Sequence, residues 1–192
     1  MNRKQKSLLR STASLKNTTL LAILFLIMCC FIIPDANRQI ELYAPGTGLI
    51  DFLIYYSPDQ LYQMIASYGK QGRQLYIAVE FSADFIFSIV IAAFFCSFLI
   101  WSDSKLKIHS IKFDYFLILP IISVVANCLE NMGIIWLLFS FPTKYFYLAF
   151  ATSFFTFLKW LSIISCIGIL AWNLINIAIL KFNHSSLFGD VN

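Results

Sequence analysis

The sequence predicts an all-α fold: a polytopic membrane protein built as a four-transmembrane-helix bundle, with an extracytoplasmic amphipathic surface helix. Of its 192 residues, 59% are hydrophobic and only 12% are charged, about half the charged share of a soluble domain. Four apolar runs are candidate membrane-crossing helices: the last three exceed the roughly 20 residues that a crossing needs, and the first is slightly shorter. Together with their loops they form a single predicted membrane domain over residues 18–180 and leave little of the chain for a second domain.

The first predicted span covers residues 18–33 and ends at Pro34, because proline lacks the amide hydrogen that continues a helix. A basic leader, residues 1–17, precedes it. A basic start before an apolar run also describes a signal peptide, but no convincing small-x-small cleavage site follows. We therefore expect an uncleaved signal anchor with a cytoplasmic leader.

The longest loop, residues 35–74, is expected to contain the surface helix. Ser57 suits the N-cap position, Pro58 suits the first turn, and Gln60 lies three residues past the cap. Apolar residues then follow at helical spacing until Gly69 supplies a stop. This helix is short and amphipathic, so the sequence predicts that it lies on the membrane surface or caps the bundle.

The remaining spans are predicted at residues 75–101, 113–141 and 146–180, followed by a cytoplasmic tail over residues 181–192. Each span exceeds the minimal crossing length, so we expect its ends to tilt or protrude. The segment before the surface helix, residues 44–56, combines glycines with an apolar run. It is too short to cross but long enough to dip into the bilayer.

The distribution of Lys and Arg predicts the orientation. Nine lie on the side of the leader, the loop after the second span and the tail, and four lie on the other side. Basic residues concentrate on the cytoplasmic side of membrane proteins. The sequence therefore predicts a multi-pass protein of the cell inner (plasma) membrane with both termini in the cytoplasm and the long loop outside.

Three of the four spans carry polar residues on one helical face, because steps of three or four residues stack side chains along one stripe. A rise of about 1.5 Å per residue places Asp84, Glu130 and Lys159 at a similar depth, so we expect them to make contact. The first span has no such stripe and is expected to be peripheral. The stripes contain Glu80, Asp84 and Ser88; Ser123, Asn127, Glu130 and Asn131; and Thr152, Thr156, Lys159 and Ser162.

Buried charges in these stripes are costly and therefore point to a function. An Asp or Lys at the centre of a span costs roughly 2.5–3.5 kcal/mol, whereas each Leu, Ile, Phe or Val returns about 0.3–0.6 kcal/mol. Ionisable residues inside a membrane are functional candidates by default for this reason. The alternative is that the charges and amides only hold the helices together.

The sequence assigns candidate roles to these residues. Glu80, Asp84 and Glu130 are candidate acid or base groups, since proton transfer needs titratable groups with separated affinities, and Lys159 is their counter-ion. Arg73 and Tyr76 at the outer mouth of the second span could instead be interface anchors. The expected ligand contacts are Asn127, Asn131 and Thr156 in the spans, Tyr76 at the mouth, and Tyr62, Tyr68 and Arg73 as a lid.

These residues predict a polar intramembrane pocket, open to the outer leaflet, that binds a lipid or other amphipathic small molecule. Whether the protein also modifies that ligand is left open. One alternative is proton- or cation-coupled transport, which with only four spans would require a homo-oligomer. Another is a structural or accessory subunit of a membrane complex.

Several other chemistries are not supported by the sequence. It contains no H-E-x-x-H or G-x-S-x-G motif and no Walker A or dinucleotide-binding glycine pattern. No histidine lies in a predicted span, and all five cysteines fall in apolar runs without a C-x-x-C pair. The sequence therefore predicts no cofactor, no metal site and no nucleic-acid partner, and leaves carboxylate chemistry.

Two resemblances accompany this interpretation. The run Tyr56-Ser57-Pro58, then Tyr62, Tyr68-Gly69, Gly72-Arg73, Tyr76, Asp84 and Asn127-Cys128-Leu129-Glu130-Asn131, resembles a family of small four-span bacterial membrane proteins without a known activity. It covers about residues 50–160 and implies the four-span fold but no chemistry. The layout is also loosely similar to the sterol-isomerase-like four-helix membrane fold, from which no residue role carries over.

Overall fold

The computed structural model describes residues 13–106 and 116–189, with side chains up to residue 182. Within these residues every regular element is helical, and four continuous helices are long and apolar enough to cross a membrane. This confirms the predicted all-α class with four candidate spans. Most of the predicted leader, Lys107 and Lys112 of the second basic loop, and the first residues of the predicted third span lie outside the described residues.

The first long helix combines α2 (Leu15–Ile27), a π-helical turn η1 (Met28–Ile32) and α3 (Ile33–Glu41). It is peripheral, as expected, since most of its large apolar side chains are exposed. The prediction that Pro34 ends this helix was wrong. The wider π turn directly before Pro34 accommodates its ring and its missing N–H, so the helix continues through it.

The segment after α3 turns back into the bundle. Gly46 and Gly48 have φ of +76° and +63°, a left-handed conformation that glycine adopts without steric cost. The chain then forms a short 3-10 turn, η2 (Ile50–Phe52), in which Ile50 and Asp51 are buried. The apolar run of this segment therefore contributes to the bundle interior.

Helix α4 (Pro58–Ser67) begins and ends where the sequence predicts. The Ser57 side chain accepts a hydrogen bond from the Gln60 N–H at 3.2 Å, and Gly69 with φ of +61° turns the chain into the next helix. That helix joins α5 (Gly69–Val79), a second π turn η3 (Glu80–Asp84) and α6 (Phe85–Leu106). It begins six residues before the predicted span. Single π turns inside α-helices often occur at functional sites, and this one carries two acids.

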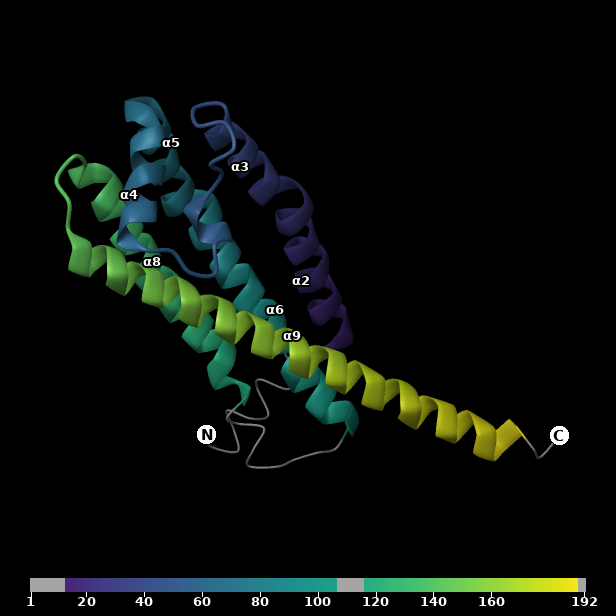
Figure 1. The fold of residues 1–192 in the computed structure, drawn as a ribbon. Coiled ribbons are helices and arrows are strands. Elements are labelled where there is room, and N and C mark those ends of the chain that lie inside the picture. The colour runs from purple at the N-terminus through teal and green to yellow at the C-terminus, as the bar shows by residue number, and fades with distance from the viewer. Residues whose placement is uncertain (1–12, 107–115, 190–192) are drawn as a thin grey trace.

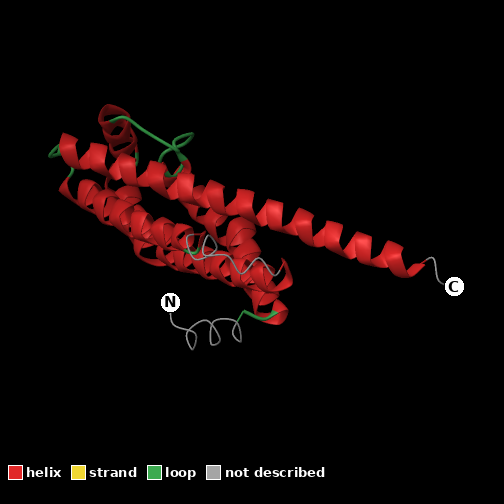
Figure 2. Ribbon diagram, turned by 90° about the horizontal axis from the view of Figure 1, so that it is seen from below, coloured by secondary structure: helices red, strands yellow, loops and turns green. Residues whose placement is uncertain are grey.

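The last two helices, α8 (Ile118–Ser140) and α9 (Phe146–Gly189), pack along each other. Helix α2 packs against α6, where the Thr18 and Ser97 hydroxyls lie 2.8 Å apart. The C-terminal part of α9 extends past the other helices in both views (Figures 1 and 2). Its large apolar side chains there are exposed, as expected for a surface in contact with lipid.

Two apolar cores flank a polar layer. One core contains buried residues of the 44–56 segment, α4, α5 and the end of α8. The other lies mainly between α6 and α9. Along the helices that carry polar stripes, Glu80, Asp84, Asn127, Glu130 and Lys159 are buried at positions between the residues of the two cores. Fold and stripe therefore place these five side chains inside the bundle.

A glycine allows the close approach of α8 and α9. A Cβ added at Gly133 would collide with Thr152 Oγ1 and would lie 3.1 Å from Thr152 Cβ, so the helix itself would have to shift. Small residues at crossings of this kind let two membrane helices pack closely. We expect Gly133→Ala to lower the free energy of unfolding by at least about 1 kcal/mol through overpacking.

The matched control for this change is Gly168→Ala on α9, where an added Cβ meets nothing within 4 Å. Because alanine favours a helix over glycine by about 1 kcal/mol, this variant should be neutral or stabilising. Unfolding by detergent titration measures both variants. Equal stabilities for the two would contradict the proposed close contact.

Candidate functional site

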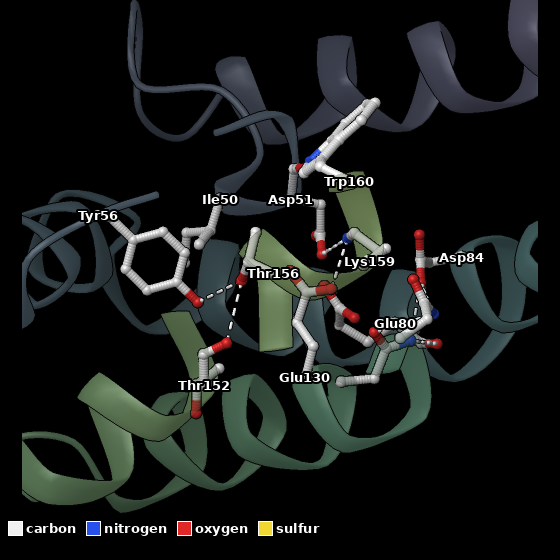
Figure 3. Close-up of polar contacts among 12 residues, drawn as sticks. Ile50, Asp51, Tyr56, Glu80, Asp84, Glu130, Thr152, Thr156, Lys159 and Trp160 are labelled. Carbon is white, nitrogen blue, oxygen red and sulfur yellow. Dashed lines mark hydrogen bonds and ion pairs between the residues drawn. The ribbon is translucent and has the colours of Figure 1, made fainter. Parts of the chain in front are cut away.

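Lys159 lies at the centre of the buried polar cluster, between Asp51 and Glu130 (Figure 3). Its Nζ is 2.5 Å from Glu130 Oε2 and 3.4 Å from Asp51 Oδ1. All three side chains are buried. The ion pair joins α8 to α9 and ties both helices to the 44–56 segment, so Lys159 has the counter-ion position that the sequence predicts.

Asp84 is held by two amides of α8. Asn127 Nδ2 and Asn131 Nδ2 donate to Asp84 Oδ2 at 2.7 and 2.8 Å. Asn127 also donates to Asn131 Oδ1 at 3.2 Å, which fixes the two amides relative to each other. The predicted amide stripe therefore contacts the predicted acid directly and orients its carboxylate.

Glu80 lies in the same cluster but without such support. It is 1% exposed, and neither of its carboxylate oxygens has a hydrogen-bond partner within the described part of the chain. One of these oxygens lies within 4.8 Å of carboxylate oxygens of both Asp51 and Asp84. Buried polar groups are almost always satisfied, so this unpartnered acid needs an explanation.

Sequence reasoning missed Asp51, which lies in the segment before α4 rather than in a span. The Tyr76 hydroxyl donates to Asp51 Oδ2 at 2.8 Å and accepts from the Ile50 N–H at 2.6 Å. Trp160 Nε1 donates to the Asp51 carbonyl at 3.0 Å. One feature of the sequence could have indicated Asp51. It is the one acid inside the apolar run of residues 49–54, in a segment expected to dip into the membrane.

Burial by itself would raise the pKa of Asp51, but the Lys159 ammonium acts in the opposite direction, and so do the contacts with the Glu80 and Tyr76 side chains. Their combined effect holds the pKa of Asp51 below its usual value of 3.8. Asp51 is therefore ionised at neutral pH, which is consistent with its position against a lysine.

A second set of hydroxyls borders the cluster on the side opposite Asp84 (Figure 3). Thr156 Oγ1 lies 3.1 Å from both the Tyr56 hydroxyl and the Thr152 carbonyl. The Tyr56 N–H donates to Ser153 Oγ at 3.0 Å. Burial raises the pKa of Tyr56 above its usual value, so its phenol stays protonated and remains a hydrogen-bond donor.

The three predicted lid residues have other partners. The Tyr62 hydroxyl accepts a hydrogen bond from the Tyr145 N–H at the turn between α8 and α9. The Tyr68 hydroxyl donates to the Gly48 carbonyl at 2.8 Å. The Arg73 guanidinium lies over the Phe141 ring, 4.6 Å from its centroid. These contacts brace the elements around the cluster, and a ligand contact for these residues stays a prediction.

A cavity opens beside the cluster. Its lining combines six polar residues with eight mainly apolar ones: Asp51, Asp84, Ser88, Ser123, Asn127 and Lys159, and Ile33, Leu49, Phe52, Val79, Phe87, Ile91, Trp160 and Ile163. The interior volume is about 60 Å³, and with its open side the free space is about 610 Å³. The interior alone has room for a few water molecules or one small polar group. All four long helices contribute to the cavity.

Comparisons with protein-family models, with curated proteins and with solved structures found no match. Neither of the two resemblances noted from the sequence gains support from them. The geometry of the cluster and its cavity is therefore the basis for a proposed function.

Proposed function

We propose that the protein binds a lipid or another amphipathic small molecule, with the polar end of that ligand in the cavity. The observation that carries this proposal is that one cavity is lined both by charged and amide side chains and by a larger number of apolar ones. Binding sites for small molecules are commonly mostly apolar, with a few polar groups that fix orientation.

The size of the cavity defines which part of the ligand enters. An interior of about 60 Å³ is far below the roughly 300–1,000 Å³ of a site that encloses a whole drug-sized ligand. Only a polar end fits beside Asp84, Asn127 and Lys159. The apolar part extends past Phe52, a lining residue that is 50% exposed, toward the surface of the bundle.

The cluster can also supply acid–base chemistry to such a ligand. Asp84 lines the cavity with its carboxylate oriented by two amides. Lys159 lines it as well and is coupled to Glu130. This pairing resembles the arrangement that general acid–base catalysis requires. We therefore keep Asp84, Glu130 and Glu80 as candidate acid or base groups.

We also propose that the protein is located in the inner (plasma) membrane, with both termini in the cytoplasm and α4 outside. The excess of Lys and Arg on the side of the termini supports this orientation. A green fluorescent protein fused to the C-terminus should fluoresce, because it folds in the cytoplasm. If that fusion is dark, and a reporter enzyme that is active only in the periplasm works at the same position, the C-terminus lies outside and the proposed orientation is wrong.

Native mass spectrometry with lipid extraction tests the binding proposal. Wild-type protein should retain a defined amphipathic molecule that Asp84→Asn and Glu130→Gln lose. The matched controls are Asp59→Asn and Glu41→Gln, both exposed, and both should retain it.

Two other outcomes have defined meanings. If all variants carry the same lipids and Asp84→Asn and Glu130→Gln are strongly destabilised, the cluster is structural. If all variants carry the same lipids with unchanged stability, the binding proposal fails, and proton or cation flux in vesicles becomes the next assay.

A further inference from the structure

We propose that Asp51, Glu80 and Asp84 bind a hard divalent cation such as Mg²⁺, Ca²⁺ or Mn²⁺. The sequence predicted no metal site, because no histidine lies in a predicted span and the cysteines form no C-x-x-C pair; Asp51 lies far from the other two acids along the chain. The fold brings one carboxylate oxygen of each to within 4.8 Å of one another. Two oxygens that share one Ca²⁺, with bonds of about 2.3–2.6 Å, lie at most about 4.6–5.2 Å apart, and the bonds of about 2.0–2.1 Å to Mg²⁺ require at most about 4.2 Å.

The unpartnered oxygens of the cluster support this inference independently. Neither Glu80 oxygen has a hydrogen-bond partner among the described residues, although the side chain is almost fully buried. Both amide hydrogen bonds of Asp84 go to Oδ2, so its Oδ1 accepts none within the described part. Lone pairs in a buried site that accept no hydrogen bond can be satisfied by a cation.

Asp51 is consistent with the same role. Its Oδ1 faces Lys159 and its Oδ2 accepts from Tyr76. Each carboxylate oxygen has two lone-pair directions, so each can bind a cation while keeping its present partner. The Tyr76 hydrogen bond would then orient a metal ligand, as outer-shell partners commonly do.

The charge of the cluster favours a divalent ion. Glu130 and Lys159 form an ion pair at 2.5 Å and compensate each other. The three other carboxylates carry three negative charges when ionised, and buried charge is costly unless it is paired. A divalent cation reduces that excess to one, whereas a monovalent cation leaves two.

The donor set indicates which cations fit. The three ligands are all carboxylates, and Mg²⁺, Ca²⁺ and Mn²⁺ prefer oxygen donors. The cavity next to Asp51 and Asp84 has room for water molecules, which complete the coordination shell of such ions. The inference concerns the cation alone and does not depend on the amphipathic ligand.

The test titrates the purified full-length protein, in uncharged detergent, with MnCl₂ and follows free Mn²⁺ by electron paramagnetic resonance. Wild type should bind one Mn²⁺ per chain, and Mg²⁺ or Ca²⁺ should displace it. Glu80→Gln and Asp84→Asn should each weaken binding by about tenfold or more, since fewer charged ligands lower the affinity. Glu41→Gln on the exposed face of α3 should bind as wild type does.

Thermal unfolding gives a second measurement on the same samples. Mn²⁺ should raise the unfolding temperature of wild type and of Glu41→Gln, because a ligand of the native state stabilises it, and should not raise that of Glu80→Gln. No saturable Mn²⁺ binding by wild type overturns the inference. Equal binding by wild type and by a folded Glu80→Gln overturns it as well, because the bound ions then lie elsewhere. Lipid retention in native mass spectra is measured separately, so failure of one proposal is distinguishable from failure of the other.

Discussion

Lys159→Met is expected to destabilise the protein by about 3–5 kcal/mol, which is the usual cost of removing one partner from a buried ion pair. Lys159 is 5% exposed and pairs with Glu130 and Asp51. Methionine keeps most of the length and apolar volume of the side chain, so the change mainly removes the charge. The two acids would remain buried near Glu80 and Asp84 without a cation from the protein.

The measurement is the free energy of unfolding by titration with a denaturing detergent. Lys70→Met is the matched control, because Lys70 is exposed, and it should change stability by less than about 0.5 kcal/mol. Adding Glu130→Gln to Lys159→Met should recover part of the loss, since neighbouring residues couple in double-mutant cycles. A Lys159→Met variant as stable as wild type would contradict the central role of the ion pair.

Tyr76→Phe is expected to cost about 2–6 kcal/mol, because it leaves two buried partners unsatisfied and each such group costs about 1–3 kcal/mol. The hydroxyl links the Ile50 N–H to the Asp51 carboxylate at 2.6 and 2.8 Å. Its loss should free the segment that carries Asp51. We therefore expect ligand retention to fall together with stability.

Tyr55→Phe serves as the matched control, because Tyr55 is 56% exposed and the same hydroxyl is removed at the surface. It should leave both stability and ligand retention unchanged. Detergent unfolding and native mass spectrometry read out the two properties. If Tyr76→Phe unfolds and binds as Tyr55→Phe does, Tyr76 does not hold Asp51 in place.

The cluster could be predicted from the sequence wherever its residues follow helical periodicity. The constant rise of a helix placed Asp84 of the second span, Glu130 of the third and Lys159 of the fourth at similar depth. The structure brings these three into one cluster with Glu80 and Asn127. Because these residues lie at a similar depth, the α8 amides can reach Asp84, and Glu130 can form its ion pair with Lys159.

Asp51 could not be predicted in the same way. It belongs to a segment without periodicity, and its position depends on the two left-handed glycines and on the Tyr76 hydroxyl. The continuation of the first helix through Pro34 was also missed. A π turn compensates for proline locally, and apolar sequence alone does not distinguish a π turn from an α turn.

The most direct test of the account is a crystal structure of the wild-type protein grown from a lipidic mesophase. The account predicts a bound amphipathic molecule with its polar end within hydrogen-bond distance of Asp84 or Lys159. Its apolar part should leave the cavity past the exposed Phe52 ring. A cavity filled by the protein's own side chains, or by water alone with lipids elsewhere on the bundle, would contradict it.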